Sequence, residues 1–284
     1  MHICRTVSDI RASMAGFRAA GDSIGLVTTM GALHAGHMQL VAEARGVHDR
    51  VVATIFVNPT QFGNQEDLAK YPRTEARDLE MLEEAGVDVV LMPEASEIYP
   101  PGDQTIVETT ELANSYHGLV RPGHFRGVAT VVTKLFNIIG PDAAYFGEKD
   151  YQQLAVIRRM VTDLHMPLRI HGVATVREAD GLAMSSRNVR LTADDREAAP
   201  VLFRALKEAE TLLFRGASVE GIAGHIRDTV SDEPRATLTG LDIVDAATFA
   251  PVTGAVTAPI GIMISAQFGD VLLIDQIELT PPKG

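Results

Sequence analysis

The sequence predicts an α/β fold, in which a doubly wound parallel sheet is covered by helices on both faces, followed by a smaller α+β domain. Short runs rich in β-branched residues alternate with helical patterns over the first 175 residues. The run at residues 51–57 is continuously apolar, as is typical of a parallel strand buried on both faces. The pattern changes after about Val176. We therefore expect two domains, at residues 1–175 and 176–284.

In the first domain, amphipathic patterns alternate with short apolar runs that end at glycine or proline. Gly86 and the pair Gly140-Pro141 are typical helix stop signals. Strands are expected at residues 24–29, 51–57, 87–92 and 143–146. Helices are expected at residues 37–47, 74–85, 124–139 and 150–164.

The second domain begins with a polar, glycine-led segment at residues 180–188, which we expect to be an exposed loop. Thr192 is expected to cap one long helix that ends at Leu213, with a second helix at residues 218–230. Strands are expected at residues 241–244, 261–268 and 271–279. The pair Gly269-Asp270 between the last two strands indicates a hairpin.

Composition excludes several classes of protein. Of 284 residues, 25 are Lys or Arg and 37 are Asp or Glu, which gives a formal net charge of −12. Such a chain has no general attraction for nucleic acid or anionic membranes. Its one cysteine, Cys4, permits neither an intrachain disulfide nor a cysteine zinc cluster. With no secretory signal pattern and no apolar run long enough to span a bilayer, we expect a cytoplasmic protein.

Residues 29–37 lie where the first expected strand turns into a helix. Glycines here allow a ligand to approach the backbone, and a helix start supplies unpaired N–H groups that suit phosphate. His34 and His37 are three residues apart and therefore share one helical face. The alternative is a glycine turn with two surface histidines. A metal pair is disfavoured because no carboxylate or cysteine lies nearby at ligand spacing.

Two further segments carry polar side chains at helix or strand ends. Residues 58–63 follow the second strand, at the edge where α/β sheets bind ligands, and Gln61 suits a hydroxy acid. Residues 121–127 place two arginines and a histidine at a helix start, which favours an anion site in an acidic protein. An ordinary Asn-Pro turn and a solvated helix end are the respective alternatives.

Residues 146–153 and 181–188 complete the set of polar segments. Lys149 offers a mobile positive charge after a strand, while Asp150 is alternatively a helix N-cap. Ser185, Ser186 and Arg187 make a good lid over a triphosphate, or a polar interdomain linker. Together the segments supply imidazole, lysine, arginine and hydroxyl donors without an evident nucleophile. This combination favours stabilisation of phosphate charge over covalent catalysis.

The chain resembles the pantothenate synthetase family over nearly its whole length. The order and spacing of the matching segments agree with that family, as does the His-x-Gly-His signature of its wider nucleotidyl-transferring group. The matching segments are residues 29–37, 57–62, 71–74, 121–127, 146–153 and 184–188. The resemblance implies a Rossmann-like first domain. It also implies a ligase that activates (R)-pantoate as pantoyl-adenylate with ATP and joins it to β-alanine, releasing AMP, pyrophosphate and (R)-pantothenate, a coenzyme A precursor.

The resemblance also implies residue roles. His37, the expected proton donor, would act in catalysis with His34, Lys149 and Arg187. Gln61 and Gln153 would bind pantoate, with Gln61 also close to the β-alanine site. ATP would be bound by Met30, Gly31, Ala32, Leu33, His34, Ala35, Gly36, His37, Gly147, Glu148, Lys149, Asp150, Val176, Met184, Ser185, Ser186 and Arg187. Members of the family need Mg²⁺ and form homodimers through the N-terminal domain, and no metal ligand is assigned here.

The sequence departs from the family pattern in three places and leaves competing functions open. Thr28 and Thr60 replace a commoner proline and methionine, which is expected to alter the shape of the pocket. Arg77-Asp78 stands where some relatives carry two acids near the metal. An adenylyltransferase that keeps the nucleotide on its product, a class I aminoacyl-tRNA synthetase and a non-catalytic nucleotide-binding protein are the alternatives. An aminoacyl-tRNA synthetase is disfavoured because the chain is short and acidic.

Overall fold

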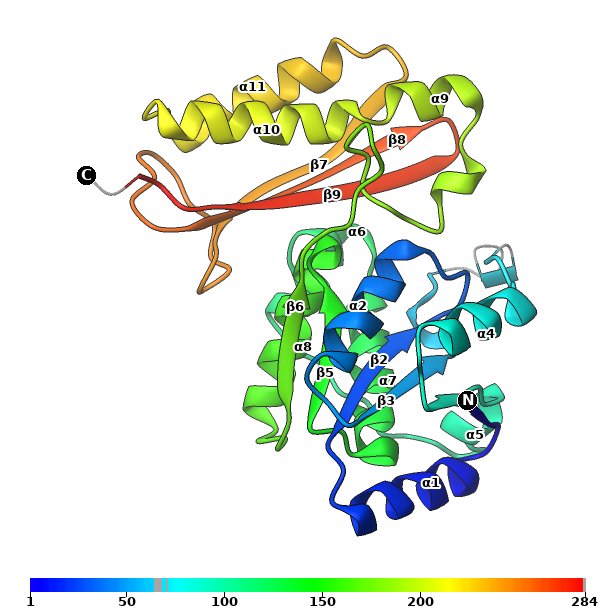
Figure 1. Cartoon of the computed structure of the whole chain (residues 1–284). Helices are drawn as coiled ribbons and strands as arrows, with labels where there is room; N and C mark the ends of the chain where they lie inside the picture. The colour runs from blue at the N-terminus through cyan, green and yellow to red at the C-terminus, as the bar shows by residue number, and fades with distance from the viewer. Residues whose placement is uncertain (64–67, 70, 283–284) are drawn as a thin grey trace. The chain divides into compact units, whose positions relative to one another are not determined.

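The computed structural model describes residues 1–63, 68–69 and 71–282, which form two compact units (Figure 1). The first unit comprises Met1–Glu148 and Gln152–Ala174, and the second comprises Lys149–Tyr151 and Thr175–Gly284. The short segment Lys149–Tyr151 therefore packs with the second unit although the chain on either side of it belongs to the first.

A six-stranded parallel sheet, in the order β1-β4-β3-β2-β5-β6, forms the centre of the first unit. This arrangement confirms the predicted α/β class. The strands are β1 (His2–Cys4), β2 (Ile24–Thr29), β3 (Arg50–Ile55), β4 (Val89–Leu91), β5 (Ala143–Gly147) and β6 (Arg169–Val173). From β2 the chain continues to β3 on one side of it, and β5 lies on the other side. The order of the strands therefore reverses between β2 and β5, and sheets of this kind bind their ligands at such a switch point.

Helices cover both faces of this sheet. A separate hydrophobic core lies on each face. Successive residues of β2 point to opposite faces, so Leu26 packs in the core with α1, α7 and α8, whereas Val27 packs in the core with α2 and α4. The longer helices are α1 (Val7–Ala20), α2 (Ala35–Arg45), α4 (Glu75–Glu84), α7 (His124–Ile139) and α8 (Tyr151–Asp163). The short ones are η1 (Pro59–Gln61), α5 (Ala95–Ile98), η2 (Leu112–Asn114), α6 (His117–Val120) and η3 (Glu148–Asp150).

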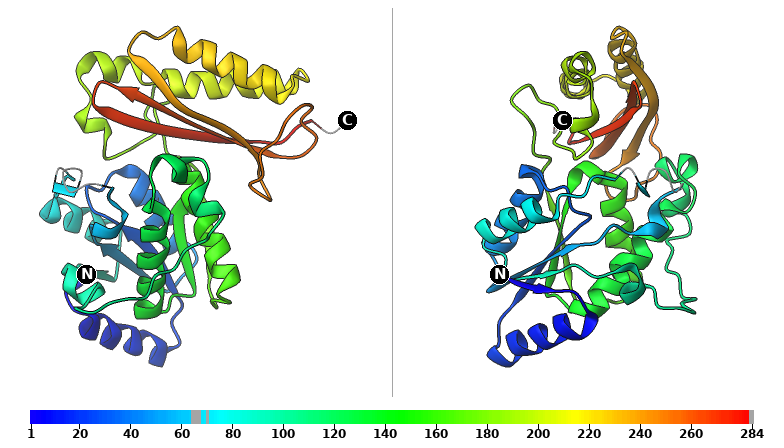
Figure 2. Two further views of the ribbon diagram at one scale, coloured as in Figure 1. Left: turned by 180° about the vertical axis from the view of Figure 1, so that it is seen from behind. Right: turned by 90° about the vertical axis from the view of Figure 1, so that its right-hand side faces the viewer.

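The second unit is a three-stranded antiparallel sheet with two long helices lying side by side on one face (Figure 2). The Gly269-Asp270 hairpin between the last two strands is confirmed. The strands are β7 (Ala236–Asp245), β8 (Ile260–Phe268) and β9 (Val271–Leu279). The helices are η4 (Asn188–Arg190), α9 (Ala193–Ala198), α10 (Val201–Phe214) and α11 (Val219–Ser231).

The expectation of one long helix from Thr192 to Leu213 was wrong. Thr192 does cap a helix, since its side chain accepts the N–H of Asp195, but that helix ends at Ala198. Pro200 separates α9 from α10, because proline has no N–H to continue the helical hydrogen bonds. Proline is tolerated at position 200, just before α10, because the first N–H groups of a helix have no partners within that helix.

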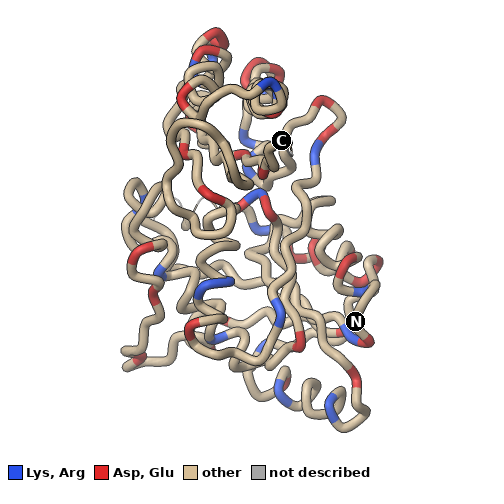
Figure 3. Tube along the Cα trace, turned by 90° about the vertical axis from the view of Figure 1, so that its left-hand side faces the viewer, with Lys and Arg blue, Asp and Glu red and all other residues tan. Residues whose placement is uncertain are grey.

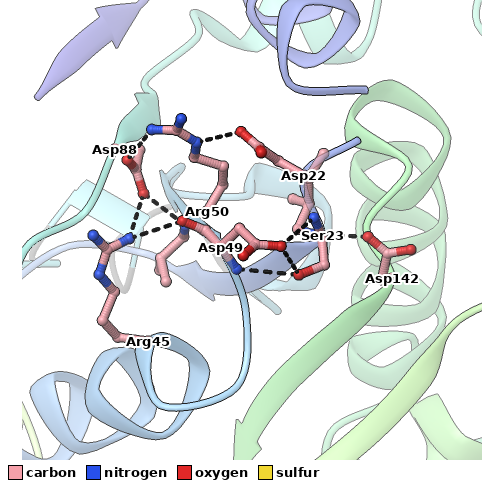
Figure 4. Close-up of polar contacts among 9 residues, drawn as sticks. Asp22, Ser23, Arg45, Asp49, Arg50, Asp88 and Asp142 are labelled. Atoms are coloured by element: carbon pink, nitrogen blue, oxygen red, sulfur yellow. Dashed lines mark hydrogen bonds and ion pairs between the residues drawn. The ribbon is translucent and has the colours of Figure 1, made fainter. Parts of the chain in front are cut away.

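Charged residues of both signs are interspersed along the chain (Figure 3), and several of them form ion pairs. One network of charged and polar side chains lies at the amino-terminal edge of the parallel sheet (Figure 4). Arg50, the first residue of β3, bonds Asp22 at 2.7 Å and Asp88 at 3.1 Å, and Arg45 bonds Asp88 at 2.9 Å. This network joins the loops that precede β2, β3 and β4, at the edge opposite the strand ends described below. Its role is therefore structural.

None of the helices in the described chain is long and apolar enough to cross a membrane.

The buried His48 predicts an acid-sensitive stability. Its side chain packs edge-on against Tyr145 at 5.8 Å, and among the described residues neither ring nitrogen has a hydrogen-bond partner. Burial lowers the pKa of His48 below its ordinary value. The unfolded chain therefore binds this proton more readily. Above the unfolded pKa of about 6.5, His48 is neutral in both states and the folded protein keeps its full stability. As the pH falls from there to the lower pKa of the folded state, the unfolded chain takes up the proton first and the free energy of unfolding decreases.

We expect His48→Leu to remove this contribution. Urea unfolding at pH 7.5 and pH 5.5 should show a smaller loss of stability on acidification in the variant than in the parent chain. The control is His165→Asn, which removes an exposed imidazole and should keep the parental pH dependence. Asparagine is chosen because it tolerates the positive φ of this position. Equal losses in the parent and in His48→Leu would show that His48 is not the acid-sensitive group.

Candidate functional site

The chain makes a tight turn between β2 and α2. Gly31 has a φ of 82° and Ala32 a φ of 50°, so two consecutive residues lie in the left-handed region. A side chain at Gly31 would place its Cβ 3.1 Å from Asp78 Oδ2 and 3.2 Å from Ile55 Cγ2. The conformation of this turn therefore requires glycine at position 31 and strains the backbone at Ala32.

Several backbone N–H groups of this turn already have acceptors within the protein. Gly31 donates to Thr29 Oγ1 at 3.1 Å, and Ala32 and Leu33 donate to the Asp78 carboxylate, each at 2.9 Å. His37 donates to the carbonyl of His34 at 2.9 Å. The expectation that the turn offers unpaired N–H groups to phosphate is therefore wrong for these positions. Any anion bound here must be met chiefly by side chains.

His34 and His37 form a reciprocal cap at the start of α2. His34 Nδ1 accepts the N–H of Gly36 at 3.1 Å, and His37 Nδ1 accepts the N–H of His34 at 3.3 Å. The ring centroids are 4.2 Å apart, as the spacing of three residues predicted. Because each Nδ1 is an acceptor, these hydrogen bonds assign the proton of each neutral ring to Nε2. The cap thus makes both histidines Nε2–H donors.

Gln61 lies in η1, just beyond β3, and its amide has a fixed orientation. Asn58, which is only 1% exposed, donates from Nδ2 to Gln61 Oε1 at 3.0 Å. Gln61 Nε2 consequently points to Met30 Sδ, 3.2 Å away. Asn58 is itself held by Tyr99, whose hydroxyl donates to Asn58 Oδ1 at 2.8 Å. The structure therefore brings Met30 and Gln61 together and presents the N–H side of the Gln61 amide beside Met30.

Thr60 supports Asn58 rather than forming part of that contact. The Thr60 side chain is exposed, and its hydroxyl donates to Asn58 Oδ1 at 3.0 Å. The departure from the family pattern at this position therefore adds a hydrogen bond beneath Gln61.

The basic segment at the start of α7 packs against η1. His124 Nδ1 lies 2.9 Å from the carbonyl oxygen of Gln61, and Arg121 Nη1 lies 3.2 Å from His124 Nε2. A side chain at Gly127 would meet the Thr60 carbonyl oxygen at 2.5 Å, so glycine is needed for this close approach. The proposed anion segment is thus adjacent to Gln61.

β5 ends at Gly147, and the chain continues directly into η3, which begins at Glu148, and then into α8. A Cβ at Gly147 would meet nothing within 4 Å, so this position is open to a ligand. Gln153 is half-buried in the first turn of α8. Its neighbour Gln152 is buried and donates to the carbonyls of Leu112 and Ser115 at 2.9 and 2.8 Å. Of the two glutamines, Gln152 is structural and Gln153 remains available for a ligand.

In the second unit, Tyr151 anchors the segment that contains Lys149 and Asp150. Its hydroxyl donates to Glu278 Oε2 at 2.9 Å, and its ring stacks on Phe249 at 5.3 Å. Lys149 is half-buried and Asp150 is exposed. The anchor joins the start of α8 to β9.

Residues 176–184 of the second unit form a small hairpin that carries Ser185, Ser186 and Arg187. Met184 donates to the Val176 carbonyl at 2.9 Å. Asn188 closes the loop by donating to Glu178 Oε1 at 3.0 Å and to the Ala183 carbonyl at 3.1 Å. The expectation of an exposed loop at residues 180–188 was wrong in part, because residues 181–183 are buried and residues 184–188 are half-buried. Met184 and Asn188 fix its two ends, and Ser185, Ser186 and Arg187 lie between them.

A resident metal would need several acidic, histidine or cysteine side chains close together. Within residues 1–63, 68–69 and 71–282, no group of three or more His, Cys, Asp or Glu side chains could hold a metal ion. Asp78 is committed to backbone N–H groups, and Arg77 beside it is exposed.

Comparisons with known proteins agree with this fold. The family model of pantoate-beta-alanine ligase matches residues 2–278. A pantothenate synthetase of Agrobacterium fabrum is 50% identical over 97% of this chain and 94% of its own length. The crystal structure of pantothenate synthetase from Thermus thermophilus superposes with a TM-score of 0.93 at 44% identity, covering 99% of this chain and 100% of that one. The pantoate-beta-alanine ligase of Francisella tularensis, complexed with beta-gamma ATP and beta-alanine, has a TM-score of 0.81 at 34% identity, with 98% and 97% covered.

Proposed function

The chain belongs to the pantoate-beta-alanine ligase family, and we propose that it condenses (R)-pantoate with β-alanine in a reaction driven by ATP. The family match over residues 2–278 carries this conclusion. It is supported by the paired Nε2–H donors of His34 and His37 at the carboxyl end of β2, where open α/β sheets bind their ligands. The product, (R)-pantothenate, is a precursor of coenzyme A.

In the first step, a pantoate carboxylate oxygen attacks the α-phosphorus of ATP, and the bond to the bridging oxygen of pyrophosphate breaks. Negative charge grows on the α-phosphate oxygens and on the departing pyrophosphate. We assign His37 as the principal donor to this charge and His34 as its partner, since each carries its proton on Nε2. Donors fixed before the reaction stabilise such charge without reorganising, which is the main source of their effect.

In the second step, the amine of β-alanine attacks the acyl carbon of pantoyl-adenylate. The carbon–oxygen bond to AMP breaks with its electron pair leaving on AMP, and the proton of the amine passes to the solvent as the amide forms. The mixed anhydride would hydrolyse in water, so orientation and exclusion of water drive this step.

We assign ATP contacts to both units. In the first they come from residues 30–37, Gly147 and Glu148. In the second we assign Lys149, Ser185, Ser186 and Arg187 to the phosphates, with Asp150, Val176 and Met184 as further contacts. We propose that residues 1–175 act as the ATP- and pantoate-binding domain and residues 176–284 as a lid domain. Mg²⁺ would accompany ATP and supply positive charge to its phosphates.

One assay tests the proposed activity. AMP and pyrophosphate should accumulate together only when ATP, pantoate and β-alanine are all present. Pantoate-dependent pyrophosphate exchange without β-alanine should report the first step alone. Transfer of the nucleotide to a stable product would instead identify an adenylyltransferase, and ATP binding without turnover would identify a non-catalytic protein.

Gln61→Ala is expected to weaken pantoate binding while ATP binding remains nearly unchanged. Asn58 fixes the Gln61 amide with its N–H side towards Met30, so Gln61 can donate to a carboxylate or hydroxyl of pantoate. Calorimetric titration with each substrate measures the two affinities separately. Thr60→Ala, which removes a support of Asn58 but leaves Gln61 in place, is the matched control and should cause a smaller loss in the same direction. Equal loss of both affinities in Gln61→Ala would contradict the assignment.

We propose that the protein forms a homodimer through its first unit and works in the cytoplasm, where ATP is made. The segment at residues 103–108 supports the dimer. It belongs to no strand, and Ile106 on it is 62% exposed, while the neighbouring Val107 is bonded to the Thr130 side chain through both its N–H and its carbonyl. An exposed apolar side chain outside the sheet is a surface that a second copy of the chain could cover. Light scattering on the purified protein should give twice the chain mass, and Ile106→Lys should reduce it.

A further inference from the structure

Asp78 occupies an unusual place for a charged side chain. It lies in the first turns of α4 and is only 1% exposed, yet among the described residues it has no ion-pair partner. Its carboxylate is instead surrounded by uncharged donors. Oδ2 accepts the N–H of Ala32 at 2.9 Å, and Oδ1 accepts the N–H of Leu33 at 2.9 Å and the Thr74 hydroxyl at 3.0 Å.

These hydrogen bonds hold a backbone conformation that the turn would not keep alone. Gly31 and Ala32 are both left-handed, and for Ala32 this conformation is unfavourable by about 1 kcal/mol or more. Such strain persists only where surrounding contacts enforce it. The two oxygens of Asp78 bind adjacent N–H groups at the centre of the strained segment. They thereby fix the direction in which the chain enters the helix that begins with His34 and Ala35.

We propose that Asp78 is a positioning residue for the phosphate chemistry: it clamps the turn and so places the Nε2–H groups of His34 and His37. This inference rests on the proposed function. A carboxylate suits the task because it accepts at both oxygens, whereas an amide offers one acceptor and one donor. Replacing one oxygen by an NH₂ group would set a donor against a backbone N–H.

The geometry disfavours a role for Asp78 as a metal ligand. Three donors already occupy its two oxygens, and the side chain is buried beneath the turn. The neighbouring position, where a second acid would be needed, is the exposed Arg77. The clamp and the metal-ligand role predict different dependence on Mg²⁺, which makes them separable by experiment.

The decisive variant is Asp78→Asn, which keeps the shape of the side chain. We expect pantoate-dependent pyrophosphate exchange to fall about 10- to 100-fold through kcat, as a displacement of about 1 Å in catalytic groups would cause. The KM for pantoate and the Mg²⁺ concentration for half-maximal rate should stay within twofold of the parent. Arg77→Ala is the matched control beside it on α4 and should keep the parental kcat. A raised Mg²⁺ requirement in Asp78→Asn, or an unchanged kcat, would overturn the proposal.

A second variant keeps the proposal testable if Asp78→Asn does not fold. Thr74→Val removes only the hydroxyl donor to Asp78 Oδ1, so it should loosen the clamp and lower kcat by a smaller factor in the same direction. Hydrogen exchange of the Ala32 and Leu33 amides should quicken in parallel. Parental kcat together with quickened exchange would refute the link between the clamp and catalysis. Absence of exchange activity in the parent chain would refute the proposed function instead, so the two failures are distinguishable.

Discussion

Replacing His37 by alanine is expected to lower the rate of pantoyl-adenylate formation by about 10²- to 10³-fold, the usual cost of removing one donor to transition-state charge. The structure adds a second effect. His37 Nδ1 accepts the N–H of His34, so alanine also removes half of the cap at the start of α2. Loss of such a cap costs about 0.5–2 kcal/mol of stability. The variant should therefore be both slower and somewhat less stable.

Two variants separate the donor from the cap. His37→Asn retains an acceptor near the position of Nδ1 but has no group at the position of Nε2. It should keep the parental melting temperature and lose as much activity as alanine. His37→Gln retains an amide N–H near the position of Nε2, so it should recover part of the rate. Pyrophosphate exchange measures the rate, and thermal melts measure stability. Near-parental turnover of His37→Asn would remove the Nε2–H group from the mechanism.

The sequence was informative where structure is set by local pattern. The helix at residues 124–139 and the strand at 271–279 were predicted with the bounds that the structure has, because continuous apolar patterns end at clear glycine, proline or turn signals. The amino-terminal helix α1 and the edge strands β1 and β6 were not identified. β1 has only three residues and β6 is only partly buried, so neither carries a strong pattern.

The candidate site divides in the same way. Glycine turns and the spacing of His34 and His37 were visible in the sequence, because they depend on neighbours along the chain. The supports of the site were not, since Asp78 lies 45 and 46 residues from the N–H groups that it accepts. Tyr99 likewise lies 41 residues from Asn58. Only the fold brings such partners together, and an aspartate within an amphipathic helix has no local signal of this role.

Arg177 was also missed, although it holds the hairpin that carries the proposed phosphate loop. Its guanidinium makes a two-pronged ion pair with Asp275 on β9, at 2.6 and 2.9 Å, and lies 4.0 Å from the centroid of Phe203. It also donates to the Gly181 carbonyl at 3.0 Å. The Asp275 side chain is 2% exposed and that of Arg177 is 19% exposed. The pair is therefore shielded from water, unlike most ion pairs of this chain.

Asp275→Ala is expected to lower the free energy of unfolding by about 3 kcal/mol, because it leaves the Arg177 guanidinium buried without its counter-charge. This expected loss lies at the lower end of the range for breaking a buried ion pair, because the Arg177 side chain keeps some contact with water. The exposed pair Arg159–Asp163 is the matched control. Its atoms are 2.8 Å apart, but its side chains are 64% and 45% exposed, so Asp163→Ala should cost less than about 0.5 kcal/mol. Urea unfolding measures both differences.

The double variant Arg177→Met with Asp275→Leu tests the physical reason for this loss. Apolar side chains of similar volume remove both charges, so stability should recover most of what Asp275→Ala lost. The cation–π contact with Phe203 and the bond to Gly181 would be absent, however, so the hairpin at residues 176–184 should exchange its amide hydrogens faster than in the parent chain. Because this hairpin carries Ser185, Ser186 and Arg187, the KM for ATP should rise while pantoate binding is retained. If the double variant is as unstable as Asp275→Ala, the loss comes from packing at position 275 and not from the unpaired guanidinium.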